Sequence, residues 1–413
     1  MQKVLTAAEM REVDRLTTER YGIPSIILME NAAHAVARVI TEKLGGSVKG
    51  KSILILCGKG NNGGDGAALA RVLWQMGARI EIVLFGKVAD SKGDARVNFE
   101  FLKRHLAEPT SENWYKEKID TGSFVLLERE DGEHFRKRYR PHLDPQIVVD
   151  AILGTGVTRP VEENLRQVFC SEWFEEAFFR DRKFIVLSVD LPSGLTADNG
   201  QSIGEHVAAE VTVTFTAPKP ANVLAPAARS NGELIIANIG TPQTLVNQSS
   251  SELYLSEKQD VFEWMYASQF SGDSYKNKRG HALIIAGSEN YAGAATLCGN
   301  AAIRSGVGLV TIGTPRSSKD LVGGRVVPEV MVRPLAETES GAISEEAIAE
   351  IEKFSKNIDA IAIGAGLSAS GRTITSGTTR PPTRSLLDRG VPIVTSPTPE
   401  RIAALPHSVA APA

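Results

Sequence analysis

Residues 57–66 read Cys57-Gly58-Lys59-Gly60-Asn61-Asn62-Gly63-Gly64-Asp65-Gly66, directly after the apolar segment Ile53-Leu54-Ile55-Leu56. That segment has the character of a buried strand, and an apolar helix is predicted from about residue 67 to 76. Glycines in such a turn let the backbone approach a ligand and adopt positive φ. A strand, a glycine turn and a helix N-terminus together favour a phosphate or another anion. The polar residues of the run predict additional contacts to sugar hydroxyls or to a cation.

The glycine spacing at Gly58, Gly60 and Gly63 matches the dinucleotide-binding fingerprint, although that match alone is weak. Ordinary dinucleotide folds place an acidic residue at the end of the second strand, where it holds the ribose. Here the second predicted strand, residues 80–85, ends in Gly86-Lys87. The sequence therefore predicts a nucleotide-like ligand and disfavours an NAD-dependent dehydrogenase. A tight turn with a purely structural role is the alternative, which the clustering of glycines and amides disfavours.

The composition excludes several classes of protein. A chain of 413 residues predicts two domains with ample core. Its net charge of −3 gives no electrostatic support for binding nucleic acid. The three cysteines are scattered, which is typical of a reduced, cytoplasmic protein. The N-terminal residues do not resemble a signal peptide, and no apolar run reaches membrane length, so no membrane partner is expected.

Short apolar strands alternate with helices along residues 1–240. Thr6 and Glu9 form a capping-box pair that predicts the start of the first helix, and a second helix is predicted over residues 25–44. This alternation predicts a buried parallel sheet with helices on both faces, a Rossmann-like doubly wound α/β fold. The predicted strands are 53–57, 80–85, 147–152, 184–190, 211–216 and 234–237.

Polar residues follow three of these strands, and ligands in such folds collect beyond the carboxyl ends of the strands. Asp150 ends one strand and precedes the segment Gly154-Thr155-Gly156-Val157-Thr158-Arg159-Pro160. Asp190 and Ser193 follow the next strand, and Lys219 follows the one after it. Any single carboxylate there is equally well explained as a helix cap. Several such groups at one edge of the sheet instead predict a functional site.

The sequence changes character twice in its second half. A Ser/Thr/Gln-rich stretch predicts a linker over residues 241–260, between an N-terminal domain (1–240) and a second α/β unit (261–367). In that unit, strands run into glycine turns at 286–295 and 363–367. Residues 368–413 are divergent, and the Ser, Thr, Gly, Arg and Pro of residues 368–385 predict a poorly ordered tail. The second domain is therefore expected to be an incomplete ribokinase-like domain.

The N-terminal motifs resemble those of the bifunctional NAD(P)H-hydrate repair enzymes. The motifs are Leu28-Met29-Glu30-Asn31, the glycine run at 60–66, Val149-Asp150-Ala151 with Gly154-Thr155-Gly156, and Asp190-Leu191-Pro192-Ser193-Gly194. This resemblance implies an epimerase for the R and S forms of hydrated NADH and NADPH. It implies substrate-binding roles for Asn61, Asn62, Gly63, Gly64, Asp65, Gly154, Thr155, Gly156, Val157, Thr158, Arg159, Pro160 and Asp190. It also implies that Asn62, Asp150 and Ser193 bind a potassium ion, and oxygen ligands of this kind suit hard cations.

The C-terminal motifs resemble the companion ADP- or ATP-dependent dehydratase. The matching segments are 280–288, 291–294, 328–331 and 363–367, and by position Ala294 and Gly366 would contact the hydrated dinucleotide. The resemblance fades after about Leu367. Thr395-Ser396 stands where acidic residues are expected, and the glycine loop with the catalytic Asp does not follow. We therefore expect an inactive dehydratase half, so that ADP or ATP with magnesium would be cofactors only if this half were functional.

Epimerisation inverts one hydroxyl-bearing ring carbon and needs an acid–base group within hydrogen-bond reach. The sequence points to Asp150 as this catalytic group, with Lys219 as its electrostatic partner. Two other functions stay open: a complete bifunctional enzyme whose missing half comes from another chain, and a non-catalytic binding scaffold. The resemblance also implies a homo-oligomer.

Overall fold

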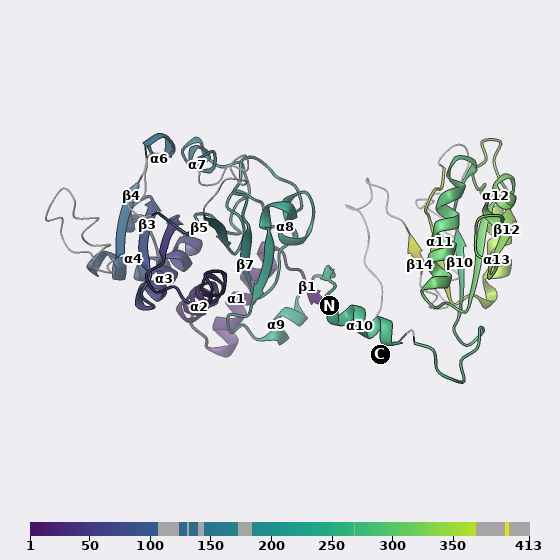
Figure 1. Cartoon of the computed structure of the whole chain (residues 1–413), viewed down its shortest axis with the longest axis horizontal. Coiled ribbons are helices and arrows are strands. Elements are labelled where there is room, and N and C mark those ends of the chain that lie inside the picture. The colour runs from purple at the N-terminus through teal and green to yellow at the C-terminus, as the bar shows by residue number, and fades with distance from the viewer. Residues whose placement is uncertain are drawn as a thin grey trace. The chain divides into compact units, whose positions relative to one another are not determined.

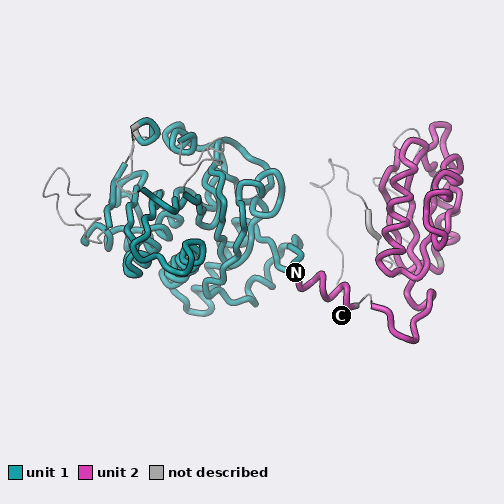
Figure 2. The backbone as a smooth tube through the Cα atoms, viewed as in Figure 1, with its two compact units in different colours: residues 1–257 teal, residues 258–413 magenta. Residues whose placement is uncertain are grey.

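The computed structural model describes residues 1–105, 124–129, 132–138, 144–171, 184–267, 269–368 and 393–395. The chain forms two compact units, residues 1–257 and residues 258–413 (Figure 2). Each unit has its own parallel sheet and its own apolar clusters. The predicted fold class, two α/β domains built on parallel sheets, is confirmed.

Unit 1 is built on a seven-stranded sheet in the order β4-β3-β2-β5-β6-β7-β8, and every neighbouring pair is parallel (Figure 1). The strands of this sheet are β2 Ser52–Cys57, β3 Arg79–Phe85, β4 Phe124–Arg129, β5 Ile147–Ala151, β6 Ile185–Val189, β7 Val211–Phe215 and β8 Glu233–Ala237. Unit 1 also contains β1 Gln2–Lys3 and β9 Tyr254–Leu255, which pair with each other. The α-helices of unit 1 are α1 Ala7–Tyr21, α2 Ser25–Lys43, α3 Asn61–Gln75, α4 Gly93–His105, α6 Gly132–Arg138, α7 Glu163–Phe169, α8 Pro220–Val223 and α9 Gln243–Gln248. Short 3₁₀ turns are Val88–Asp90 and Ala227–Asn231.

Alternation along the strands gives this sheet two buried faces. Ile53 and Ile55 pack into one apolar cluster with side chains of α2, α3 and α4. Leu54 and Leu56 pack into a second cluster that includes Phe135 of α6. Because successive side chains of a strand point to opposite faces, a continuous apolar strand is stable only between two covering layers.

The chain reverses its direction of travel across this sheet between β2 and β5. From β2 the order runs outward through β3 to β4, and from β5 it runs the other way to β8. The loops that leave two such adjacent strands diverge and open a crevice at their carboxyl ends. The segment after β2 begins the glycine run, and the segment after β5 is residues 152–160. Topology alone thus brings these two predicted motifs together.

The glycine run differs from its prediction as a turn, because α3 begins at Asn61 instead of at about residue 67. Gly63, Gly64 and Gly66 are therefore helical, and none of them has a positive φ. Their role is close packing. A Cβ on Gly64 would lie 2.7 Å from the Cα of Ala95 on α4, and one on Gly66 would lie 2.7 Å from the Cβ of Ala151 on β5.

The beginning and end of unit 1 are held together. The predicted capping box at Thr6 and Glu9 is confirmed, with both reciprocal hydrogen bonds present. Strand β1 pairs antiparallel with β9. Within the predicted linker, residues 241–260, the chain forms α9, whose Leu245 and Val246 are buried with Met10 of α1. A polar composition hid this short amphipathic helix.

Unit 2 carries a five-stranded parallel sheet in the order β12-β11-β10-β13-β14. Its direction of travel reverses between β10 and β13. Its strands are β10 His281–Ile285, β11 Leu309–Pro315, β12 Val330–Leu335, β13 Ala360–Ile363 and β14 Ile393–Thr395. Its α-helices are α10 Lys258–Ala267, α11 Ala292–Arg304, α12 Lys319–Gly323 and α13 Ala347–Phe354, with 3₁₀ turns Glu289–Tyr291, Arg316–Ser318 and Ser355–Asn357.

The predicted tail, residues 368–413, lies outside the described residues except for Ser368 and β14. Within the described part of the chain, no helix is both long and apolar enough to span a bilayer.

Candidate active site

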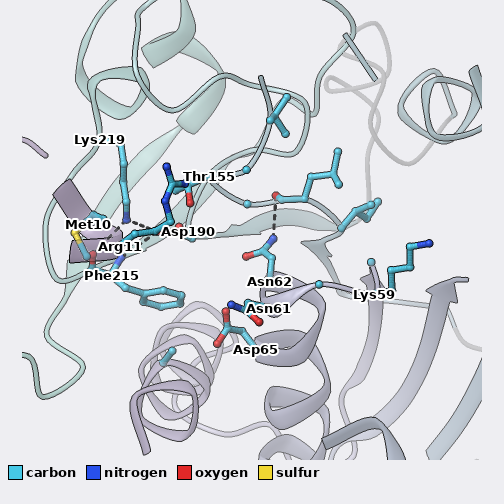
Figure 3. Close-up of a pocket in the computed structure, with 18 of the residues that line it drawn as sticks. Met10, Arg11, Lys59, Asn61, Asn62, Asp65, Thr155, Asp190, Phe215 and Lys219 are labelled. Atoms are coloured by element: carbon cyan, nitrogen blue, oxygen red, sulfur yellow. Dashed lines mark hydrogen bonds and ion pairs between the residues drawn. The ribbon is translucent and has the colours of Figure 1, made fainter. Parts of the chain in front are cut away.

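A cavity of about 850 Å³ opens at the crevice between β2 and β5 of unit 1. Its walls come from the start of α3, the segment after β5, the ends of β6 and β7, and helices α1 and α2 (Figure 3). Predicted site residues that line it are Asn61, Asn62, Asp65, Gly154, Thr155, Gly156, Val157, Thr158, Arg159, Pro160, Asp190 and Lys219. The structure thus brings together groups that are 158 positions apart, from Asn61 to Lys219.

Asp190 and Lys219 form a buried ion pair on the cavity wall (Figure 3). The lysine side chain is 2% exposed and the carboxylate 16%. Lys219 Nζ donates to Asp190 Oδ1, to Thr214 Oγ1 at 3.0 Å and to the Phe215 carbonyl at 3.3 Å. All three donors of the ammonium are therefore directed to acceptors, as burial of this charge requires.

The backbone fixes both members of this pair. Asp190 lies immediately after β6 with φ 65°, a left-handed conformation that Asp tolerates better than most residues and that is enriched at functional sites. Its Oδ1 also accepts from Thr214 Oγ1 at 3.0 Å. Lys219 precedes α8, and its backbone N–H donates to Asn222 Oδ1 at 2.7 Å.

Asp150, the predicted acid–base residue, has no exposed surface and does not line the cavity. Its carboxylate accepts four hydrogen bonds: Ser188 Oγ at 2.8 Å, Ser193 N at 2.8 Å, Ser193 Oγ at 2.5 Å and Ile152 N at 3.3 Å. Burial raises the pKa of Asp150, and these hydrogen bonds oppose the shift. The prediction of direct contact with the reacting carbon therefore needs correction. Asp150 is the one polar residue of β5, and its hydrogen-bond partners lie on β6 and in the segments after β5 and β6.

Of the three residues predicted to bind potassium, Asn62 and Ser193 contact the backbone of Leu153, and Asp150 contacts Ser193. The Leu153 carbonyl accepts from Asn62 Nδ2 at 3.0 Å and lies 3.0 Å from Ser193 Oγ, whose hydrogen is directed to Asp150. The Leu153 N–H donates to Ser193 Oγ at 2.8 Å. Ser193 in turn contacts Asp150. Hydroxyl, carboxylate and carbonyl oxygens, together with the amide nitrogen of Asn62, thus lie within one small cluster that joins α3, the segment after β5 and the segment after β6.

Gly63 and Gly64 are buried behind the cavity wall and are absent from its lining. Their predicted contact with substrate therefore needs correction, because they face Gly58 and α4. Asn61 is exposed at the start of the helix. Gly60, the N-cap residue, provides no side-chain cap, so the first N–H groups of α3 face the crevice without a capping side chain.

Among the other carboxylates that line the cavity, Asp65 and Asp14 have raised pKa values. Burial raises the pKa of Asp65 well above its usual range; the charges of Asp190 and Asp14 add to the shift, and Lys219 opposes it. Asp14, on α1, is not among the predicted site residues. The sequence did contain a signal for Asp14, because Met10, Asp14 and Thr17 are spaced so as to share one face of a helix. The structure buries Met10 and Thr17 on that face.

Ala294 and Gly366, the predicted substrate-binding residues of the second domain, lie in unit 2. Ala294 is in the first turn of α11, and Gly366 follows β13 with φ 75°. A Cβ on Gly366 would lie 2.8 Å from the Cβ of Ala294, so the two residues are adjacent.

Comparison with known proteins finds a family match within each unit. Residues 25–221 match the family of YjeF-related protein N-termini, and residues 282–378 match the NAD(P)H-hydrate dehydratase family. The bifunctional NAD(P)H-hydrate repair enzyme Nnr of Moorella thermoacetica is 36% identical over 371 residues, which are 90% of this chain and 65% of that protein. The enzyme of the same name from Thermofilum pendens is 32% identical over 372 residues, 90% of this chain and 64% of that protein.

The chain thus spans slightly less than two thirds of the length of these relatives. The resemblance to bifunctional NAD(P)H-hydrate repair enzymes that the motifs predict is confirmed: the chain carries a YjeF-related domain and a segment of the dehydratase type. The crystal structure of the yeast protein ynu0 aligns with 62% of this chain and 98% of its own, at 22% identity and a TM-score of 0.45.

Proposed function

We propose that unit 1 is an NAD(P)H-hydrate epimerase, which interconverts the R and S forms of hydrated NADH and NADPH. The observation that carries the proposal is the buried Asp190–Lys219 pair on the wall of the 850 Å³ cavity, within the segment that matches the YjeF-related family. A cavity of this size suits a nucleotide-sized ligand. A binding scaffold would gain nothing from a desolvated ion pair, since such a pair is costly to bury.

The start of α3 is the proposed site for the pyrophosphate of the hydrated dinucleotide. The N–H groups that follow Gly60 and the helix dipole favour an anion there. Asn61, Asn62 and Asp65 supply polar side chains on one side of the cavity, and residues 154–160 supply the facing loop. Gly63 and Gly64 contribute by letting the helix approach β2 and α4 closely.

The cluster around Leu153 fits the potassium ion that the resemblance implies. Ser193, Asp150 and the Leu153 carbonyl supply oxygens there, and a single carboxylate among neutral oxygens matches a singly charged hard cation. Asn62 directs its Nδ2 to the Leu153 carbonyl, so its Oδ1 would bind the ion only after the amide turns over. These three residues would hold the ion. When bound, it would supply a positive charge that balances Asp150 and fixes the loop after β5 against α3.

The proposed chemistry takes place at the hydroxyl-bearing ring carbon. Loss of the hydroxyl, assisted by the ring nitrogen, and return of water from the opposite face invert this carbon. Asp190 is the proposed acid–base residue in place of Asp150, because Asp190 lines the cavity and Asp150 does not. Lys219 holds the Asp190 carboxylate in position and stabilises its charge.

For the second domain we propose substrate contact by Ala294 and Gly366 without dehydration by this 413-residue chain. Thr395 stands at the end of β14, where the resemblance leads to an acidic residue. Binding of ADP or ATP with magnesium belongs to the alternative, in which the chain dehydrates as well. The domain boundaries at 240 and 260, the cytoplasmic location and the homo-oligomeric state stay proposals.

The test supplies the purified chain with R-hydrated NADH in potassium buffer and follows the S form by chromatography. Conversion faster than the spontaneous reaction supports the epimerase, and a rate equal to the spontaneous reaction contradicts it. Replacing potassium with sodium should lower the rate if the Leu153 cluster binds potassium. A parallel reaction with ADP or ATP and magnesium follows the absorbance of NADH. Formation of NADH there would contradict the inactive dehydratase half.

A further inference from the structure

Asp14 lies on the cavity wall and has no role in the mechanism above. It belongs to the face of α1 that carries Met10 and Thr17, and this face is directed into unit 1. Met10, Arg11 and Asp14 all line the cavity, and Figure 3 shows Met10 and Arg11 beside Asp190 and Lys219. A carboxylate on this face is unusual, because the inner face of an amphipathic helix is normally apolar.

The Asp14 carboxyl group lacks partners of the kind that Asp190 has. Its Oδ1 is buried and has no hydrogen-bond partner among the described residues. The charged groups that face it are Asp65 on α3, Asp190 after β6 and Lys219 before α8, while Arg11 is the cavity-lining charge on its own helix. Helix α9, which packs on α1, carries no titratable side chain. A buried, unpartnered carboxylate oxygen favours the protonated acid.

Asp190 and Asp14 are thus held in different environments within one cavity. Asp190 accepts from an ammonium group and a hydroxyl, which stabilise its negative charge. Burial raises the pKa of Asp14 to about 6, a shift that the charge of Lys219 opposes and that of Asp190 increases. Pairs of carboxyl groups whose environments differ in this way commonly divide the roles of acid and base.

We propose that Asp14 is the proton donor of the epimerisation, and that Asp190 accepts the proton of the returning water. This inference rests on the proposed function of unit 1. In the first step the C–O bond breaks, its electron pair leaves with the oxygen, and the Asp14 proton converts the leaving hydroxyl into water. The lone pair of the ring nitrogen forms the C=N bond of the resulting cation, and Asp14 is left as a carboxylate.

In the second step water adds to the opposite face of the same carbon. The new C–O bond forms from a lone pair of the water, the C=N pair returns to nitrogen, and the proton passes to Asp190. Return of one proton from Asp190 to Asp14 restores the enzyme, and both groups line the same cavity. In the reverse direction the same two groups exchange roles.

The test compares pH profiles of kcat/KM for the wild type, Asp14→Asn and a matched control, Glu12→Gln. Glu12 is an exposed carboxylate on the same helix, paired with Arg15 outside the cavity. An acid must be protonated to act, so the wild-type rate should fall as the pH rises above about 6. Asp14→Asn should lower kcat roughly 100-fold, abolish this alkaline limb and leave KM within about twofold. Glu12→Gln should follow the wild type.

Asp65→Asn is measured alongside, because Asp65 is the other carboxyl group with a raised pKa in the cavity. An alkaline limb that persists in Asp14→Asn, or one that only Asp65→Asn removes, would overturn the role of Asp14. Asp14→Ser, smaller and uncharged, provides the same readout if the Asn amide is not accommodated. A wild-type enzyme without activity would instead refute the proposed epimerase itself.

Discussion

The two units share a topology and differ in the chemistry at its edge. In unit 1 the strand order reverses between β2 and β5, and in unit 2 between β10 and β13. At the first reversal lie a buried lysine and several carboxylates, among them Asp190. At the second, the buried polar groups are the hydroxyls of Ser288 and Thr314, both without a hydrogen-bond partner among the described residues. The carboxylate next to Ser288, Glu289, is exposed.

This difference shows that a doubly wound sheet provides a place for a ligand without specifying a reaction. Hydroxyl groups and close glycine contacts can hold a polar ligand, but they do not exchange protons near neutral pH. Carboxylates in contrasting environments can. Proton chemistry is therefore expected at the edge of unit 1, and ligand contact at the described edge of unit 2. The predictions below test this contrast, beginning with the largest effect.

The largest effect is expected from Asp190→Asn. It removes the negative partner of Lys219 and leaves a buried ammonium group with only neutral acceptors. Epimerisation should slow by about 10²–10⁴-fold, the usual contribution of a positioned acid–base group. Chromatography of the R and S forms measures the rate. Activity within about tenfold of the wild type would show that the charged pair does not distinguish the two units.

A smaller effect on the reaction is expected from Asp150→Asn, since Asp150 does not line the cavity and instead accepts hydrogen bonds from the segments after β5 and β6. Its carboxylate accepts from two N–H groups and two hydroxyls, and an amide nitrogen there would oppose at least one donor. The free energy of unfolding should fall by roughly 2–3 kcal/mol, the cost of an unsatisfied buried donor. Urea denaturation measures it. Ser188→Ala is the control, and by deleting one hydroxyl donor it should cost only about 1 kcal/mol. Equal stability of wild type and Asp150→Asn would contradict this account.

Substituting two glycines of unit 2 tests whether backbone conformation shapes the edge of its sheet after β13. Gly366→Ala places a Cβ 2.8 Å from that of Tyr291 at φ 75°, which should cost about 1–2 kcal/mol. Gly293→Ala, in the neighbouring α11, meets no atom within 4 Å and should be neutral or stabilising. Thermal unfolding of both variants gives the comparison. Equal melting temperatures would mean that the turn after β13 adjusts freely.

Sequence patterns predicted the architecture of unit 1 because its strands are continuous apolar runs. Strands β2, β3 and β5–β8 lie within two residues of their predicted ends. β4 escaped prediction, and so did β1 and β9, two-residue strands too short to show a period. The early start of α3 also escaped, because glycine composition suggests a turn and only tertiary packing explains helical glycines at 63, 64 and 66.

The site was predictable as a set of strand ends, but the role of each residue was not. Order along the strands placed Asp150 and Asp190 at the same edge. Asp150, however, lies within β5, whereas Asp190 follows the end of β6 with a positive φ, and only Asp190 lines the cavity. Asp14 comes from a helix that precedes the sheet in the sequence, so no rule about strand ends includes it. Asp14, Asp150 and Asp190 differ in their hydrogen-bond partners, and these partners depend on tertiary contacts that periodicity does not encode.

The smallest effect concerns the cost of ionising Asp14. Its pKa is raised from 3.8 to about 6 in the folded protein, so the native state binds the proton more tightly than the unfolded chain does. Wild-type stability should therefore be lost as the pH rises from about 4 to about 6, and Asp14→Asn should lack this loss. Two pKa units correspond to about 3 kcal/mol, and residual solvent contact reduces the expected gain of the variant at neutral pH to about 1–2 kcal/mol. Urea denaturation of both proteins at pH 4 and pH 7 measures the difference. If the two proteins differ in free energy of unfolding by the same amount at both pH values, Asp14 titrates as an ordinary surface carboxyl group. The contrast between the charged edge of unit 1 and the neutral edge of unit 2 would then rest on the Asp190–Lys219 pair alone.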